Sequence, residues 1–398
     1  MGKHSRTIDR RTFTIAAGGA AIAAVPAARA LAQSASPVVG PTGTVVAEGL
    51  WNPRFLAFTD DGSLYVTEVG VGGDEVFTFG PPEATPVDAA EATPASGPPA
   101  TRGTTGQVSV VAPDGTLSVV VGGLPSYSAG VGPCGICVQD GTVYFTVGGT
   151  AVLAQQTPLD GENTLQKIDL AAGTASIVAE FNTYEIENNP DGTDINPNLY
   201  SVSVGDSDGR LTVNDAGSNT IFSVDGATGE FTLRGIVPDL NTLTANSDTP
   251  HTDDPARQPV PTGGVYKGTT YYTAILSEGW PVDGPSILKV DGDGLFATFT
   301  SVAAGLSMVT GTAVGPDGNI YFVQLFDDLA SGAPIGSVNR LNLADGTHEA
   351  VVPGLTMPHG ITFDGDGNLY VTTQVLMSAP GVAMGQIMRF DGIGAPTA

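Results

Sequence analysis

The sequence predicts an all-β protein, a six-bladed β-propeller whose last blade is completed by a strand from the N-terminal region. Two observations carry this prediction. The 398-residue chain contains 54 glycines and 29 prolines, nearly twice their average usage, which indicates many turns between strands. In addition, a phrase of two short apolar runs joined by a glycine-containing turn occurs six times, and such repetition is typical of propellers.

Each repeat begins with proline or a substitute for it, and continues with an apolar run, a polar turn and a second apolar run that usually contains tyrosine. An Asp-Gly turn between alternating runs predicts a β-hairpin with a type I′ turn. A third run follows each hairpin, and a fourth follows most, as at 116–121 and 347–352. Each repeat therefore predicts a four-stranded antiparallel sheet. The six turn glycines are Gly62, Gly141, Gly209, Gly268, Gly318 and Gly367.

Closure of the ring is predicted from the two ends of the repeat array. The sixth repeat ends at 391–392 without a fourth strand, whereas residues 43–49 form an apolar run ahead of the first hairpin. We expect this run to pair into the last blade, which would leave no long exposed edge. The propeller would then span residues 43–393, between a flexible stretch at 33–42 and a tail at 394–398. An open sandwich of irregular strands is the alternative, and the repeat spacing disfavours it.

Residues 1–32 have the features of an export signal, with a basic start, a moderately apolar stretch and small residues at the exit. The arginines at 10–11, followed by Phe13, resemble a twin-arginine signal, with cleavage after Ala32 or two residues earlier. The apolar stretch is interrupted by Pro26 and is too weakly apolar to span a bilayer. We therefore predict export by the twin-arginine (Tat) route to the periplasm or the outside, without a membrane anchor.

Charge and low-complexity segments restrict the partners. Fifteen Lys and Arg against 41 Asp and Glu give a net charge of −26, which argues against nucleic acid and anionic membranes as partners. We expect a monomer. The Pro/Ala/Thr-rich segment at 80–105 predicts a disordered insertion between the second and third strands of blade one. Residues 182–197 and 239–259 are expected to be polar loops.

The phrases at 52–68, 214–221 and 279–281 resemble the ScyD/ScyE family of exported proteins, whose founding members are linked to cyanobacterial scytonemin biosynthesis. The resemblance covers essentially the whole mature chain. More distantly, the chain is similar to NHL-repeat, strictosidine-synthase-like and gluconolactonase-like six-bladed propellers. The resemblance implies the fold and export, but it brings no catalytic signature. Cys134 and Cys137 depart from the family pattern.

Ligands of propellers bind where the innermost strands surround the central channel. Aligning the repeats on the residue after the proline predicts a first ring of Arg54, Cys134, Asn198, Thr262, Thr310 and His359. A second ring, six residues beyond each turn glycine, comprises Glu68, Val147, Asp215, Ala274, Gln324 and Thr373. The predicted ligand-binding residues are Arg54, Glu68, Asn198, Asp215, Thr262, Thr310, Gln324 and His359. The alternative is that these side chains only form hydrogen bonds to neighbouring blades.

A catalytic centre is not assigned by the sequence. His359 is the only one of the four histidines at a channel position, where it could act as a general base, although a lone histidine is more often structural.

Metal sites are weakly indicated. Gluconolactonase-like enzymes hold a channel metal with Glu, Asn and Asp, and Glu68, Asn198 and Asp215 match that set by residue type alone. The acidic turns at 206–208 and 364–368 lack the length and final glutamate of an EF-hand. We predict no cofactor, with a divalent cation such as Ca²⁺ as the alternative.

The two cysteines are three positions apart. In an exported protein such a pair is expected to form a disulfide, and two buried thiols are the alternative. Redox catalysis is disfavoured because the pair lies on a strand and not at a helix start. Zinc would need further ligands of the same kind.

These observations predict an exported propeller that binds a small molecule or a protein partner at its axial funnel. A metal-dependent hydrolase of the lactonase type is one alternative, and a scaffold for other proteins is another. A quinone-dependent sugar dehydrogenase is disfavoured, because it needs several basic residues in the funnel and only Arg54 and His359 are available.

Overall fold

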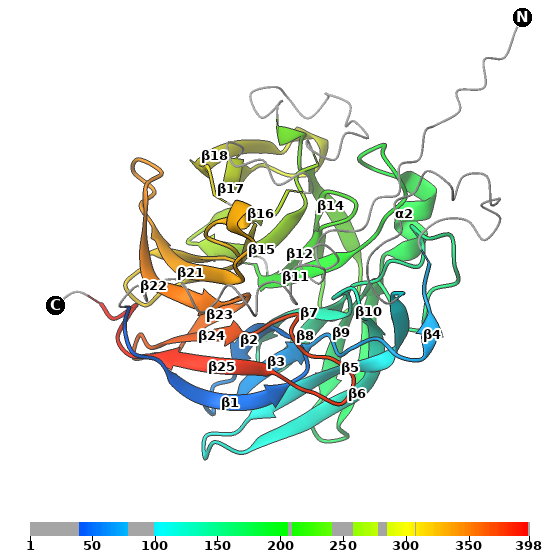
Figure 1. Cartoon of the computed structure of the whole chain (residues 1–398). Helices are drawn as coiled ribbons and strands as arrows, with labels where there is room; N and C mark the ends of the chain where they lie inside the picture. The colour runs from blue at the N-terminus through cyan, green and yellow to red at the C-terminus, as the bar shows by residue number, and fades with distance from the viewer. Residues whose placement is uncertain are drawn as a thin grey trace, which may run out of the picture.

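The computed structural model describes residues 40–78, 99–205, 209–240, 258–277, 285–306 and 308–396. The expected export signal and most of the expected insertion at 80–105 lie outside these residues. The described chain forms six antiparallel sheets that follow one another around a common centre in chain order (Figure 1). The predicted six-bladed β-propeller is confirmed.

Each blade has four main strands, to which blade one adds the two-residue strand β4 (Glu75–Val76), and the first strands of successive blades contact one another at the centre. Blades one to three comprise β2 (Pro53–Phe58), β3 (Leu64–Glu68), β5 (Thr101–Val111) and β6 (Leu117–Tyr127); β7 (Pro133–Gln139), β8 (Thr142–Val147), β9 (Thr164–Asp169) and β10 (Thr174–Glu180); and β11 (Leu199–Val204), β12 (Leu211–Asp215), β13 (Thr220–Val224) and β14 (Phe231–Ile236). Blades four to six comprise β15 (Pro261–Lys267), β16 (Thr270–Ile275), β17 (Pro285–Asp291) and β18 (Thr298–Ala304); β19 (Val309–Val314), β20 (Ile320–Gln324), β21 (Ile335–Leu341) and β22 (His348–Thr356); and β23 (Ile361–Phe363), β24 (Leu369–Thr373), β25 (Gly385–Phe390) and β1 (Thr44–Leu50).

The last blade is closed by the N-terminal strand, as predicted. Strand β1 pairs antiparallel with β25, from Thr44 opposite Arg389 to Leu50 opposite Gly385. Leu50 is buried against side chains of blades one and six. The outer edge of β25 is thereby covered, so the ring is held together by its own first strand.

The hydrophobic core lies between neighbouring blades. Successive residues of a strand face opposite sides of a sheet, so Tyr271 of β16 packs toward blade three whereas Tyr272 packs toward blade five. In β20, Tyr321 packs toward blade six and Phe322 packs toward blade four. Because both faces of a blade are covered, the second strands are buried along almost their whole length.

The six turn glycines all have positive φ, between 59° and 84°. The loop formed by Asp140 (φ 51°) and Gly141 (φ 74°) has two residues, as a type I′ turn requires. In blade one the loop is longer, because the Thr59 amide donates to the Ser63 carbonyl and the Gly62 amide to the Thr59 carbonyl. Blades five and six have the same arrangement. The role of glycine is confirmed, but the type I′ prediction is wrong for these three blades.

Two segments differ from expectation. Strand β5 begins at Thr101 and includes the last five residues of the expected disordered insertion, because it pairs with β6 and with the two-residue strand β4 (Glu75–Val76). The segment 182–197, expected to be a loop, begins with helix α2 (Asn182–Asn188). Two 3₁₀ turns, η3 (Gly294–Phe296) and η4 (Leu329–Ser331), complete the described elements. In the described part of the chain, no helix has the length and hydrophobicity needed to cross a membrane.

Candidate functional site

The pairing of first and second strands fixes the register of the central residues. The first residue of each first strand lies opposite the end of the second strand, as in Pro53–Glu68, Pro133–Val147, Leu199–Asp215, Pro261–Ile275 and Val309–Gln324. The residues that follow these five positions, together with His359 after Pro358 in blade six, form the first ring, which comprises Arg54, Cys134, Tyr200, Thr262, Thr310 and His359. Five of the six members agree with the sequence alignment. In blade three, Tyr200 takes the place expected for Asn198.

The correction in blade three has a signal in the sequence. Pro197 stands 12 residues before its turn glycine, whereas the prolines that open the other repeats stand 7 to 9 residues before theirs. Leu199, at 10 residues, occupies the proline position in the structure. In the second ring, Ile275 replaces Ala274, because Gly268 is the first residue of its two-residue hairpin loop whereas Gly141 is the second residue of the corresponding loop in blade two.

The carbonyl groups of the first ring hold adjacent blades together. A side chain of one blade donates a hydrogen bond to a ring carbonyl of the next, as in Thr67–Cys134, Thr146–Tyr200, Asn214–Thr262, Thr310–His359 and Thr372–Arg54. The Thr262 hydroxyl donates to the Val309 carbonyl at 2.7 Å. The hydroxyls of Thr262 and Thr310 are therefore used between blades, which is the structural alternative to ligand binding.

Glycine follows four of the ring residues because the next blade approaches too closely for a side chain. A Cβ atom on Gly135, Gly263, Gly311 or Gly360 would lie closer than 3.0 Å to the backbone of the neighbouring blade. In blades one and three this position is occupied by Phe55 and Ser201 instead.

Phe55 belongs to an aromatic group at the centre of the ring. Its ring centroid lies 5.2 Å from that of His359, at an interplanar angle of 90°, and 6.0 Å from that of Tyr200, at 88°. The Tyr200 hydroxyl and His359 Nε2, from blades three and six, share a hydrogen bond of 2.6 Å. His359 is predicted from its place in the repeat, but Phe55 and Tyr200 are not, because an aromatic residue on an inner strand cannot be told from a core residue by pattern alone.

Arg54 lies within this group and is 3% exposed. Its Nη2 donates to the Gly130 carbonyl, in the connection between blades one and two, at 2.6 Å. No described carboxylate lies within ion-pair distance of its guanidinium. The charge of Arg54 influences the pKa values of Cys134, Tyr200 and His359. The guanidinium of blade one therefore lies close to side chains of blades two, three and six.

Burial sets the protonation of the central residues. Burial, assisted by the charge of Arg54, holds the pKa of His359 well below its usual value, so the imidazole is neutral. Burial raises the pKa of the Cys134 thiol to about 12, against the opposing effect of Arg54. Burial likewise raises the pKa of Tyr200. Arg54 is therefore the only charge that the first ring carries at neutral pH. His359 Nδ1 is buried without a hydrogen-bond partner.

Strained backbone surrounds the same end of the axis. Asn52, Val260, Met308 and Met357 each precede a ring residue by two positions, and each has a φ between 41° and 56°. This region is unfavourable for a β-branched residue such as Val260. Such strain is concentrated at functional sites. Met308 and Met357 belong to an apolar cluster formed by the residues that flank the inner strands of blades four to six, with Leu276, Leu325, Phe326, Val375 and Leu376 as its other buried members.

The two predicted carboxylates form hydrogen bonds within their own blades. Glu68 accepts bonds from the Trp51 amide, the Gln107 side chain and the Ser109 hydroxyl, while burial raises its pKa. Asp215 Oδ1 accepts the amides of Asn198, Gly217 and Ser218, and burial raises its pKa to about 6. Gln324 is buried at the end of β20.

The gluconolactonase resemblance implies a channel metal held by Glu68, Asn198 and Asp215. It would require Glu68, Asn198 and Asp215 to converge on the axis. The recorded hydrogen bonds of these residues are instead made to groups of blades one and three, and the first ring contains no carboxylate. We therefore derive no chemistry through a metal at the axis.

Cys134 and Cys137 are free, buried thiols in the structure. Cys134 packs with the central cluster that contains Phe55 and Tyr200, whereas Cys137 packs with Val202 and Leu211 between blades two and three. The two side chains thus belong to different cores. The arrangement corresponds to the alternative of two buried thiols.

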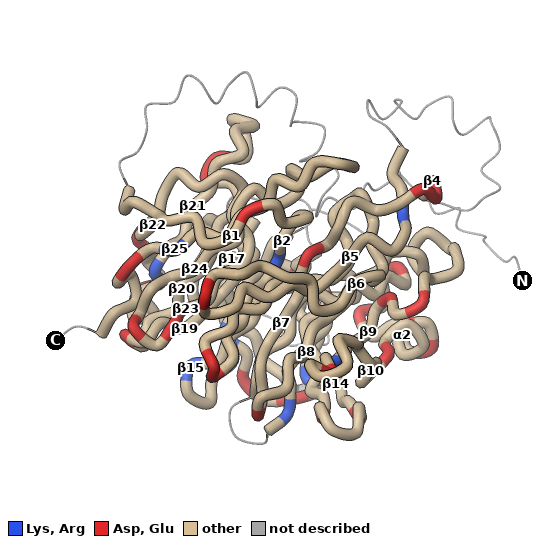
Figure 2. The backbone as a smooth tube through the Cα atoms, turned by 90° about the horizontal axis from the view of Figure 1, so that it is seen from below, with Lys and Arg blue, Asp and Glu red and all other residues tan. Residues whose placement is uncertain are grey.

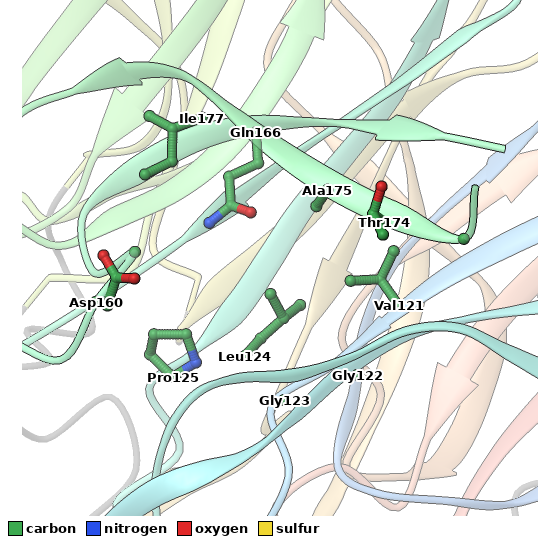
Figure 3. A pocket seen from close by; sticks show the side chains of 12 residues that line it. Val121, Gly122, Gly123, Leu124, Pro125, Asp160, Gln166, Thr174, Ala175 and Ile177 are labelled. Atoms are coloured by element: carbon green, nitrogen blue, oxygen red, sulfur yellow. The ribbon is translucent and has the colours of Figure 1, made fainter. Parts of the chain in front are cut away.

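A separate open groove of about 330 Å³ lies between β6 and the outer strands of blade two. Figure 3 shows its lining, which is mainly aliphatic and backbone, with Asp160 as the sole acidic side chain and Gln166 beside it. None of the predicted site residues lines this groove.

No protein-family model matches the sequence, and no curated protein matches it. Among solved structures, the chain is similar to a gluconolactonase from Xanthomonas campestris (12% identity, TM-score 0.52, covering 88% of this chain and 89% of that one). It is also similar to a protein of unknown function from Bacteroides thetaiotaomicron (14%, TM-score 0.51, 88% and 72%) and to virginiamycin B lyase from Staphylococcus aureus (14%, TM-score 0.45, 86% and 87%). Identities this low show the fold alone. The expected similarity to gluconolactonase-like propellers is therefore confirmed as a shared six-bladed architecture, and membership of the ScyD/ScyE family remains a prediction.

Proposed function

We propose that this protein is an exported binding protein that takes a small anionic molecule with an apolar body at the axial end where the first strands begin. The observation that carries the proposal is Arg54, a buried guanidinium without an ion-pair partner among the described residues. Burying an unpaired charge is costly. A carboxylate would match the planar donors of the guanidinium in a bidentate pair.

The surroundings of Arg54 support both parts of this ligand. The Tyr200–His359 pair adds a neutral polar contact beside the guanidinium. Met308, Met357 and Leu376 supply apolar surface at the adjoining loops, and flexible methionine side chains adapt to ligands of different shape. Apolar linings with a few placed polar groups are typical of small-molecule sites.

Thermal unfolding with a ligand panel tests the proposal. The panel contains carboxylates of increasing apolar size, together with amines and alcohols of the same carbon skeleton. Ligands that bind only the folded state raise Tm, so the carboxylates should raise it and the amines should not. Arg54→Gln should abolish the effect. Arg340→Gln should preserve it, because Arg340 is half-exposed and pairs with Glu349 on the outer strands.

Other results would favour the alternatives. Equal stabilisation by amines, or unchanged carboxylate binding in Arg54→Gln, would overturn the assignment. Turnover of a lactone that depends on added Ca²⁺ or Zn²⁺ would support the hydrolase instead. Mass spectrometry of the natively purified protein identifies a copurifying ligand directly, and a stoichiometric protein partner in its place would support the scaffold.

A further inference from the structure

The outermost strand of blade one has a free edge. Strand β6 pairs with β5 along one side only. Among the outer strands that the structure describes it is the longest, with 11 residues against nine in β22 and six or seven in β1, β10, β14 and β18. Residues 117–124 contain neither a charged residue nor a proline, the residues with which proteins usually protect exposed edges. Val119, on this strand, is 56% exposed. The edge is therefore open to another chain.

The groove between β6 and blade two has an apolar floor and an open rim of glycine. Val121 and Leu124 line it and are buried. Gly122 and Gly123 line it and are exposed. These two glycines stand opposite a single residue of β5, Gln107, in a β-bulge. A bulge leaves one residue without a partner in the ladder, and glycine has no side chain to cover its backbone. Main-chain groups of β6 are thus accessible from the groove.

The ends of the groove lie where turns of blade two approach β6. A Cβ atom on Gly173 would lie 3.5 Å from the Val120 carbonyl oxygen, and one on Gly161 would lie 3.9 Å from Pro125. The stretch of β6 between these two contacts, residues 121–125, spans about 16 Å. An extended chain of about five residues has the same length.

Gln166 of β9 points into this groove (Figure 3). The side chain is only 5% exposed. Among the described residues, its recorded hydrogen bond runs from Nε2 to the Thr164 hydroxyl at 2.9 Å, which leaves Oε1 and the second Nε2 hydrogen for a ligand. A peptide group carries the matching pair, one N–H and one C=O. The buried amide therefore supplies the polar recognition that the apolar floor lacks.

The charge at the groove is acidic. Asp160 is exposed at one end of the groove, and no lysine or arginine is among the described residues that line it. Figure 2 shows further acidic positions around β9 and α2, and the whole chain has a net charge of −26. Complementary charge selects partners and speeds their association. The groove therefore favours a basic partner over an acidic one.

We propose that the groove between blades one and two binds an extended peptide segment in which a basic residue adjoins an apolar one. The apolar side chain would contact Val121 and Leu124, and the basic side chain would pair with Asp160. One peptide group of the segment would bond to the Gln166 amide, and the exposed backbone of β6 would supply further main-chain hydrogen bonds. This site uses none of the residues of the axial site.

Fluorescence anisotropy with the full-length protein and the labelled peptide Gly-Val-Lys-Val-Gly-amide tests the site. Wild-type protein should bind this peptide saturably, and it should bind the peptide with glutamate in place of lysine more weakly. Gln166→Met keeps the length of the side chain and removes the amide, so it should weaken binding by roughly tenfold or more. Asp160→Asn should reduce the preference for lysine. Asp140→Asn is the matched control, because Asp140 is exposed on the same blade outside the groove, and it should bind as wild type does.

Several outcomes would overturn the proposal. These are no binding by wild-type protein, equal binding by wild type and Gln166→Met, and equal affinity for the lysine and glutamate peptides. Should Gln166→Met fail to fold, Gly122→Phe must weaken binding instead, and unchanged binding refutes the site. A Cβ atom on Gly122 would meet only the Val119 side chain, at 3.8 Å, so this variant should fold with its new ring at the groove.

Sedimentation of the same proteins identifies a different occupant. If wild-type protein forms a dimer that Gly122→Phe dissociates, the groove binds a second copy of the chain, and the peptide proposal is overturned. Carboxylates that bind at Arg54 should not displace the peptide, so the proposed function and this site fail independently of each other.

Discussion

Replacing Thr372 by valine tests the hydrogen bonds that close the ring between blades six and one. Thr372 is fully buried, its hydroxyl donates to the Arg54 carbonyl at 2.7 Å, and the same oxygen accepts the Gly360 amide at 2.8 Å. Valine has nearly the same shape, so the substitution removes both interactions without a large cavity. Two buried backbone groups are then left unpaired, and we expect the free energy of unfolding to fall by about 2–6 kcal/mol.

Two further variants isolate this effect. Thr372→Ser keeps the hydroxyl and loses one methyl group, so it should cost only about 1 kcal/mol. Thr347→Val changes an exposed threonine whose hydroxyl bonds to Asp345, and it should alter stability by less than about 0.5 kcal/mol. Equilibrium urea unfolding, followed by tryptophan fluorescence, measures all three. A Thr372→Val protein as stable as wild type, or a serine variant as unstable as the valine variant, would refute the reasoning.

Three other outcomes follow from the central residues. Gly360→Ala should lower the free energy of unfolding by roughly 1–3 kcal/mol, because its Cβ would meet the backbone of blade one. Gly365→Ala has open space around the new methyl group, and it should leave stability in urea unchanged. The unfolded chain binds a proton to His359 more readily than the folded chain, because the folded pKa is lowered from 6.5; stability should therefore fall as pH drops through about 6.5, and His359→Gln should show a smaller fall in urea midpoints. Cys134 and Cys137 should not react with a thiol reagent in the native protein, and both should react after unfolding without reductant; failure to react when unfolded would indicate the disulfide.

The fold could be predicted because its determinants are local and repeated. Glycine is required at the six hairpin turns by positive φ, and the phrase around it recurs in the sequence. The closing strand could be inferred because the last repeat lacked a fourth strand, and β1 supplies it. Turn type was predicted less well, since loop length also depends on where strand pairing stops, as at Thr59 and Ser63.

The site was predicted only in part, because it depends on register between blades and on side-chain packing. Arg54 and His359 were identified by their place in the repeat. Tyr200 was missed because the alignment followed Pro197, while strand pairing follows Leu199. Helix α2 was also missed, because the Asn- and Pro-rich composition of 182–197 predicted a loop.

A crystal structure of the protein with a carboxylate selected from the thermal panel tests the central claim most directly. We predict density for the carboxylate against the guanidinium of Arg54, with the apolar part of the ligand toward Met308 and Met357. Density for the ligand elsewhere, with Arg54 paired to a carboxylate of the protein itself, would contradict the account.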